Sequence, residues 1–380
     1  MSNNAQFRDV YFPQLDGLRA IAVGLVIVFH WLPDRQGVNM IANGPLGVTL
    51  FFVLSGFLIT RILLENKVDI EEEGIFSLYR AFMTRRILRI FPIYYLVLIC
   101  IWFLQYNTFI DPIETQLYTH PAYYLFYGSN FLIDKFSNWA DVLSIYWTLA
   151  VEEQFYIFWP LIIWKVPNRF LKTVVIGVIF LALLTRGVLF FLENNAGVLV
   201  PTCLDSFGMG ALWAIILAED KAAEKFVRNI RWWAVYGALV FFILCTADQR
   251  SLFEALFFRT GASIFCLYLV AKASYGTGFK SYFGRFIENR FIRYVGKISY
   301  GIYMYHMLIP YLIVPLMIKL FRRLFHVEVR LTEQSNIILS LFLLVGVAAL
   351  SWYFVEKPFI RLKKRFQVSR VKPGYVEMTS

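Results

Sequence analysis

Charged residues are scarce in this 380-residue chain. Asp, Glu, Lys and Arg make up 17% of the sequence, whereas 59% of the residues are hydrophobic and 18% are aromatic. An average soluble domain carries roughly 25% charged residues. Because so few charges cannot cover a water-exposed surface, the composition excludes a soluble globular protein. It predicts an all-α, polytopic integral membrane protein.

Cysteine is also scarce, and its four positions include no CxxC pair. Cys100, Cys203, Cys245 and Cys266 lie within apolar runs, which indicates packing rather than a disulfide framework or a zinc site. We therefore expect no metal and no permanently bound cofactor. The first apolar run has no small-residue cleavage site, so we expect no signal peptide. No internal repeat or low-complexity segment is evident.

About ten apolar segments have the length of ~20 residues that a helix needs to cross ~30 Å of hydrocarbon. They lie near residues 15–33, 46–64, 87–105, 145–164, 173–192, 203–218, 232–247, 253–271, 294–317 and 336–355. Short apolar patches around residues 123–133 predict a surface or re-entrant piece. We treat residues 1–360 as one transmembrane domain and 361–380 as a basic cytoplasmic tail, which we expect to be disordered.

The distribution of basic residues predicts the orientation. If the N-terminus is cytoplasmic, most of the 37 Lys and Arg residues fall on the cytoplasmic side, so we expect both termini there and the chain in a bacterial cytoplasmic (inner) membrane. The net charge of +11 then follows from topology and from attraction to anionic lipid headgroups. Because the basic residues are dispersed over many loops, they do not predict nucleic-acid binding.

The first apolar helix carries two ionisable residues, Arg19 and His30. Their separation of 11 positions places them on one helix face, about 16 Å apart along the axis. Ionisable groups at membrane depth normally face a cavity or a partner and mark a functional path. The alternative is that Arg19 is a snorkelling flank residue and His30 an interfacial histidine.

Three arginines follow the second span in the stretch RRILRIFPIYY. Their spacing puts Arg85 and Arg89 on one face of a helix at the cytoplasmic surface, with Arg86 beside them. Guanidiniums bind phosphates bidentately and would suit a phosphorylated cytoplasmic ligand. The alternative is an ordinary positive-inside flank. Pro92 lies inside the apolar run, where it can kink the helix.

The fourth span contains adjacent acidic residues in the stretch WTLAVEEQFYIFWP. Glu152 and Glu153 point about 100° apart on a helix, so at most one can be aimed squarely into a narrow site. We expect Glu153 to lie near the depth of His30, where the two could meet. The alternative is a structural ion pair between helices, for example with Arg186.

A polar stripe runs along the ninth span in GKISYGIYMYH. Ser299, Tyr303 and His306 follow i, i+4, i+7 spacing, and Tyr300 takes a neighbouring face. The hydroxyls could simply bond across helices, whereas His306 is a functional candidate. Further polar candidates in or beside the spans are Trp147, Gln154 and Asp205.

Taken in order, these stretches resemble the acyltransferase family 3 of membrane O-acyltransferases. The shared features are the pair Arg19 and His30, GVTLFFVLSGFLIT at 47–60, RRILRIFPIYY, WTLAVEEQFY, GKISYGIYMYH and the closing EKP at 356–358. The resemblance implies a ten-helix membrane enzyme that transfers an acyl group, commonly acetyl, from cytoplasmic acyl-CoA to a hydroxyl of a glycan or related acceptor. It also implies that Arg19 and His30 are essential.

Two features differ from the family pattern. That pattern has an arginine shortly before Asp205, where this chain has Cys203, which leaves a ligand contact of that arginine unsupported. Some relatives carry a fused hydrolase-like domain after the membrane part, and we expect none here because only a short basic tail follows residue 360.

Acyl transfer from a thioester to an alcohol needs a base, a donor for the oxyanion and exclusion of water. We expect His30 to act as the general base, Glu153 to orient its imidazole and Arg19 to hold the donor. The nucleotide phosphates would be held by Arg85, Arg86 and Arg89. A distance of about 16 Å is comparable to an extended pantetheine arm, so one ligand could touch both Arg19 and His30.

A rival interpretation is a proton-coupled transporter or flippase, since a helix bundle with buried Arg, His and Glu could also move protons. The acceptor stays open among lipopolysaccharide O-antigen, exopolysaccharide, a lipid-linked sugar, peptidoglycan and a secreted small molecule. The sequence specifies neither the acyl chain length, nor a direct or acyl-enzyme route, nor the oligomeric state.

Overall fold

The chain is all-α, as predicted, and no strand occurs in the part that the structure describes. The computed structural model describes residues 11–33, 37–41, 43–106, 115–192, 197–219, 222–246, 251–328, 330–362 and 366. The long helices are α1 (Pro13–Trp31), α2 (Asn43–Lys67), α4 (Ile75–Tyr106), α7 (Trp147–Lys165), α8 (Asn168–Phe191), α9 (Val200–Ala218), α10 (Ala223–Cys245), α11 (Leu252–Ala273) and α16 (Glu333–Ser351). The shorter ones are α3 (Ile70–Glu73), α5 (Pro121–Leu125), α6 (Ser129–Phe136), α12 (Tyr282–Glu288), α13 (Arg290–Lys297), α14 (Ser299–Tyr305), α15 (Val314–Phe325) and α17 (Lys357–Leu362).

Eight described helices are long and apolar enough to cross a membrane, or nine if a bent helix pair counts as one span. The sequence predicted about ten. Helix α7 is 19 residues long but is not among the eight. Its polar residues Glu152, Glu153 and Gln154 lower the hydropathy of a segment that otherwise has spanning length.

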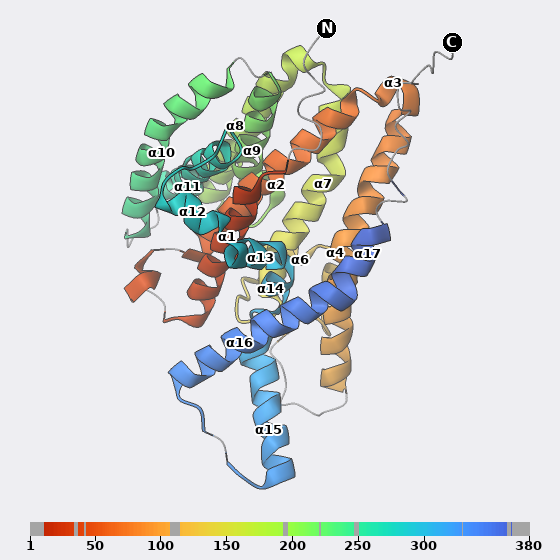
Figure 1. Cartoon of the computed structure of the whole chain (residues 1–380), viewed down its shortest axis with the longest axis vertical. Coiled ribbons are helices and arrows are strands. Elements are labelled where there is room, and N and C mark those ends of the chain that lie inside the picture. The colour runs from red at the N-terminus through yellow and green to blue at the C-terminus, as the bar shows by residue number, and fades with distance from the viewer. Residues whose placement is uncertain are drawn as a thin grey trace, which may run out of the picture.

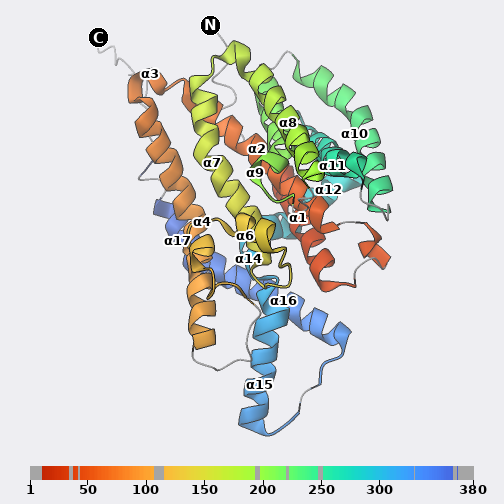
Figure 2. The same ribbon diagram turned by 180° about the vertical axis from the view of Figure 1, so that it is seen from behind.

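The predicted span at residues 294–317 is wrong as a single helix. Helix α13 ends at Lys297, α14 occupies the next turns, and a π-helical turn at Ile309–Ile313 leads into α15. Helix α14 and the helical segment Ile309–Phe325, which contains the π turn and α15, are bent by 42° relative to each other. Pro310 lies in the π turn and has no N–H to continue an α-helical ladder, which accounts for the break. In both views α15 extends away from the other helices (Figures 1 and 2).

Helix α2 lies at the centre of the bundle. Helices α8, α9, α10 and α11 lie on one side of it, and α4 and α17 lie on the other (Figures 1 and 2). Two glycines bring α2 and α9 into close contact. A Cβ atom on Gly56 would lie 2.1 Å from the carbonyl oxygen of Phe207, and one on Gly210 would lie 2.1 Å from that of Val53. Side chains at these positions would push the two helices apart.

The expected surface or re-entrant piece forms the short helices α5 and α6. It is held against the long helices by polar contacts rather than lying loosely on the surface. Tyr94 on α4 donates a hydrogen bond to the carbonyl of Tyr124 at 2.7 Å. Asn130 on α6 is fully buried and pairs with Gln154 on α7, whose Nε2 lies 2.9 Å from the Asn130 Oδ1.

Candidate functional site

A long, narrow cavity lies between α1, α2, α4, α7 and α14. On α2 its lining residues extend from Val48 to Ile62, which corresponds to about 21 Å along the helix axis. The cavity has a volume of about 210 Å³. Its charged lining residues are Arg19, Arg86, Arg89 and Glu152. The structure therefore brings together four of the residues that the sequence singled out on three separate helices.

On α4 the cavity is lined by Arg86, Arg89 and Ile90, which follow i, i+3, i+4 spacing and share one helix face. Arg85 is half-buried and does not line it. The sequence named all three arginines as phosphate ligands, and the structure places two of them, Arg86 and Arg89, in the cavity lining. Residues 85 and 86 point about 100° apart, and the edge of the cavity falls between them.

The three cavity arginines differ in their partners. Arg19 forms an ion pair with Asp16, with 2.7 Å between Nη1 and Oδ1. The guanidinium carbon of Arg86 lies 5.4 Å from the ring centroid of Tyr156. Arg89 has neither a hydrogen bond nor an ion pair within the described residues. Three guanidiniums against one lining carboxylate favour an anionic ligand.

The carboxylate of Glu152 is fixed in the cavity wall by two hydroxyl groups. Ser55 on α2 donates to Oε1 at 3.1 Å, and Tyr156 donates to Oε2 at 2.9 Å. The sequence analysis did not single out either hydroxyl. Tyr156 could have been found, because it lies one helical turn after Glu152 and so shares its face. Ser55 lies in an apolar run, where nothing in the local pattern marks it.

The neighbours of Glu152 point elsewhere. Glu153 is 5% exposed and its Oε1 has no hydrogen-bond partner, whereas Gln154 donates to the carbonyl of Tyr127 at 2.8 Å. Among the residues that the structure describes, no hydrogen bond joins Glu153 to His30. The sequence argument that two adjacent carboxyls cannot both face one narrow site agrees with this arrangement, but the residue that faces the cavity is Glu152 rather than Glu153.

Two aromatic candidates have different surroundings. Tyr300 lines the cavity and donates a hydrogen bond to the carbonyl of Ile90 at 2.8 Å, which ties α14 to α4 two residues before Pro92. Trp147 does not line the cavity. Its ring packs edge-on against Phe52, with the ring centroids 6.1 Å apart. Only Tyr300 of this pair is positioned to contact a ligand in the cavity.

His30 lies beside His306 rather than beside a carboxylate. The two ring centroids are 5.0 Å apart, and His306 Nε2 lies 3.4 Å from His30 Nδ1. His306 is fully buried, whereas His30 is half-buried. Tyr303 lines the cavity and its ring centroid lies 5.4 Å from that of His306. Tyr303, His306 and His30 thus form a chain of ring contacts that leads away from the cavity, and His30 itself does not line it.

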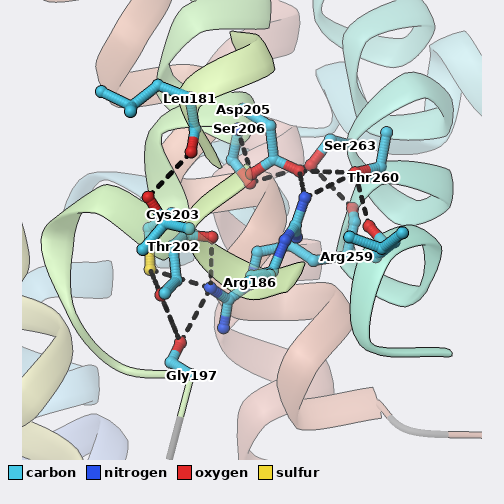
Figure 3. Close-up of polar contacts among 12 residues, drawn as sticks. Leu181, Arg186, Gly197, Thr202, Cys203, Asp205, Ser206, Arg259, Thr260 and Ser263 are labelled. Atoms are coloured by element: carbon cyan, nitrogen blue, oxygen red, sulfur yellow. Dashed lines mark hydrogen bonds and ion pairs between the residues drawn. The ribbon is translucent and has the colours of Figure 1, made fainter. Parts of the chain in front are cut away.

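Asp205 belongs to a second polar cluster, away from the cavity (Figure 3). Arg186 donates to Asp205 Oδ2 and to the hydroxyl of Thr260, at 2.7 Å each. The expected interhelical ion pair of Arg186 therefore exists, but with Asp205 instead of a glutamate. Arg259 on α11 lies 2.9 Å from the sulfur of Cys203. A guanidinium from another helix thus reaches the position where the family pattern has an arginine.

Comparisons with known proteins agree with the resemblance. The model of acyltransferase family 3, described as an acyltransferase domain, matches residues 12–356. The O-acetyltransferase OatA of Staphylococcus aureus is 28% identical over 389 residues, which cover 96% of this chain and 59% of the relative. The peptidoglycan O-acetyltransferase OatA of Listeria monocytogenes is 26% identical over 389 residues, which cover 94% and 57%. The chain thus spans little more than half the length of these relatives. No solved structure matches it.

Proposed function

This chain belongs to the acyltransferase family 3, and we propose that it is a membrane O-acetyltransferase that uses acetyl-CoA to acetylate a hydroxyl of a glycan outside the cytoplasm or linked to a lipid. The relatives support acetyl transfer, and the Listeria relative is named for peptidoglycan. A peptidoglycan or related polysaccharide hydroxyl is therefore the first acceptor to test.

The observation that carries the proposal is the unbalanced positive charge of the cavity. Arg86 and Arg89 face it from one side of α4, and Glu152 is the single carboxylate in its described lining. Both guanidiniums are half-buried and lie near the carboxylates of Glu152 or Glu356, but neither forms an ion pair within the described residues, which leaves their donors available to an anionic ligand. Acyl-CoA supplies a diphosphate and a 3′-phosphate, which are the groups that arginine binds most strongly.

The shape of the cavity limits which part of the donor it encloses. A volume of about 210 Å³ is smaller than the roughly 300–1,000 Å³ of pockets that enclose drug-sized ligands. Its length of about 21 Å along α2 nevertheless matches an extended pantetheine arm. The thioester arm would therefore enter the cavity, and the nucleotide would stay at the mouth, on the side predicted to be cytoplasmic.

The acceptor hydroxyl would approach His30 from the opposite side. His30 takes the hydroxyl proton at Nε2, the alcohol oxygen attacks the thioester carbonyl, and the carbon–sulfur bond breaks. The CoA thiolate then takes up the proton, so that the products are an acetyl ester and CoA thiol. Arg19 would hold the donor arm from the cavity wall. Because His30 does not line the cavity and is connected to it through the rings of Tyr303 and His306, transfer requires these rings to shift when both substrates are bound.

The test is transfer of labelled acetyl from acetyl-CoA by the purified protein in lipid nanodiscs, with peptidoglycan oligosaccharides and other bacterial glycans as acceptors. We expect CoA-thiol release that depends on the acceptor, and a loss of about 10²–10⁴-fold in His30→Ala. His326→Asn, at an exposed position, is the control and should keep the wild-type rate. CoA release without acceptor dependence, or a fully active His30→Ala protein that folds normally, contradicts the proposal.

A further inference from the structure

His306 contacts His30 through its imidazole ring, and this contact indicates a role for His306. We propose that His306 is a positioning residue: it acts with the Val26 carbonyl to hold the ring of His30 with Nδ1 inward, and it stabilises the cation that forms when Nε2, the basic nitrogen, takes a proton. The catalytic meaning of this inference rests on the proposed function. The tautomer itself follows from the hydrogen-bond geometry and can be measured without any activity.

The tautomer of His306 follows from its backbone contact. Its Nδ1 lies 2.7 Å from the carbonyl oxygen of Tyr303. A carbonyl oxygen can only accept a hydrogen bond, so Nδ1 must carry the proton. In the neutral ring Nε2 then holds a lone pair, and this nitrogen faces His30. His306 is fully buried, and its backbone carbonyl accepts a hydrogen bond from the Trp31 indole at 2.9 Å, which fixes the backbone of this residue against α1.

The same reasoning fixes the proton of His30. Its Nδ1 lies 2.9 Å from the carbonyl oxygen of Val26 and 3.4 Å from the Nε2 of His306. The carbonyl oxygen and the Nε2 of His306 are both hydrogen-bond acceptors, so a proton on Nδ1 of His30 is attracted by both. If the proton were on Nε2 of His30 instead, the lone pair of Nδ1 would face these two acceptors and repel them. The favoured tautomer therefore leaves Nε2 unprotonated, and the described residues supply no hydrogen bond to Nε2.

This arrangement gives His306 the function that the sequence analysis assigned to Glu153. When Nε2 of His30 takes a proton from the acceptor hydroxyl, the ring becomes a cation with an N–H at each nitrogen. The Nδ1–H then donates more strongly to the Val26 carbonyl and to the His306 lone pair, which stabilises the cation in place. A hydrogen-bonded group that orients a catalytic histidine is a recurring feature of acyl-transfer sites, and its loss lowers rates by up to about 10⁴-fold.

The kinetic test compares His306→Gln with His306→Leu. The Gln side-chain oxygen can lie near the position of the imidazole Nε2 and accept the proton of His30 Nδ1, whereas Leu fills similar space without an acceptor. We expect kcat in the Leu variant to fall about 10²-fold or more, with the KM for acetyl-CoA within twofold of wild type, and the Gln variant to recover at least tenfold over Leu. Equal activity of folded Gln and Leu variants, or a wild-type rate in the Leu variant, would overturn the proposal.

The tautomer test uses ¹⁵N-histidine NMR of the membrane-reconstituted protein at about pH 8, where an ordinary imidazole is neutral. The chain has only four histidines, so His30→Ala suffices to assign the His30 signals. We expect a protonated Nδ1 and an unprotonated Nε2 on His30. In His306→Leu the Val26 carbonyl should keep the same tautomer, but the Nδ1 signal should shift because one of its two acceptors is lost. A proton on Nε2 in the wild type overturns the inference. If the tautomer is as expected but no acceptor is acetylated, the proposed function fails and the positioning of His30 stands.

Discussion

Two groups of arginines inside the bundle differ in how their positive charge is paired. In the cluster of α8, α9 and α11, Arg186 is matched by Asp205, which is fully buried, and by the hydroxyl of Thr260 (Figure 3). In the cavity, Arg86 and Arg89 outnumber the single lining carboxylate of Glu152. In the first group Arg186 is buried against its own carboxylate, whereas the guanidiniums of the second group line a cavity.

Arg186 is buried and paired with a carboxylate, whereas Arg86 and Arg89 are half-buried and line a cavity, so the two groups differ in both burial and pairing. Removing charges from water costs several kcal/mol per ion, and a matched pair recovers that cost within the protein. Arg186 has a carboxylate in direct contact, although two of its guanidinium nitrogens lack partners. Arg89 forms no ion pair among the described residues and interacts with Glu152 and Glu356 only through longer-range electrostatics. Mutations that change charge balance in each region should therefore affect different quantities: stability in the cluster and donor affinity in the cavity.

The largest effect should come from Asp205→Ala. The substitution leaves the Arg186 guanidinium buried without an anion, which lowers stability by about 3–5 kcal/mol in comparable buried pairs. Thermal unfolding in detergent, followed by size-exclusion of the soluble fraction, measures the loss. The double variant Arg186→Met with Asp205→Leu removes both charges and should be closer to wild type than the single variant. A fully stable Asp205→Ala protein would end the structural interpretation of this cluster.

Arg89→Ala should have the next largest effect, and on a different quantity. Loss of a charge-assisted hydrogen bond to a phosphate costs about 1.5–3 kcal/mol, so the KM for acetyl-CoA should rise about 10–100-fold while thermal stability is unchanged. A small change in kcat would show that the contact contributes equally to ground and transition states.

Arg85→Ala is the matched control for Arg89→Ala. It removes the same side chain from the same helix, but its position does not line the cavity. The KM should therefore change by less than about threefold, within the range of a surface charge effect. A wild-type KM in both variants would mean that both arginines act only through membrane topology, and an equal rise in both would mean that Arg85 also contacts the donor.

The local parts of this arrangement could be predicted from the sequence because helix periodicity is local. The face shared by Ser299 and Tyr303 lines the cavity as the i, i+4 spacing indicated. Arg19 likewise faces the interior of the bundle. The sequence could not separate Arg85 from Arg86, because two adjacent residues both lie near the edge of a polar face and only the position of neighbouring helices decides which of them lines the cavity.

The non-local contacts could not be predicted. His30 and His306 are 276 positions apart, and Arg186 reaches Asp205 on another helix. Single-sequence patterns carry no information on which helix faces meet. The break near Ile309 was also missed, because the hydrophobic run continues through it and the bend depends on Pro310 and on packing against α16.

A third prediction concerns the one carboxylate of the cavity. Glu152→Gln keeps an oxygen that can accept from either Ser55 or Tyr156, turns its NH2 group toward the other hydroxyl, and removes the negative charge near Arg86. If the cavity binds an anion, the KM for acetyl-CoA should fall about two- to fivefold, which corresponds to about 0.4–1 kcal/mol. A raised KM would mean that Glu152 contacts the donor directly. The cavity would then not act simply as a site of positive charge, in contrast to the paired Arg186.

The smallest effect should come from Lys172→Ala, which tests whether pairing alone stabilises a cation in this protein. Lys172 on α8 is paired with Glu219, and their side chains are 39% and 49% exposed. Exposed ion pairs contribute about 0–1 kcal/mol, because water already solvates both charges and the long side chains lose entropy when they pair. Unfolding midpoints within the error of wild type are therefore expected, in contrast to Asp205→Ala. A loss as large as that of the buried pair would mean that burial is not what distinguishes Arg186, and the criterion that separates it from Arg89 would have to be sought in geometry instead.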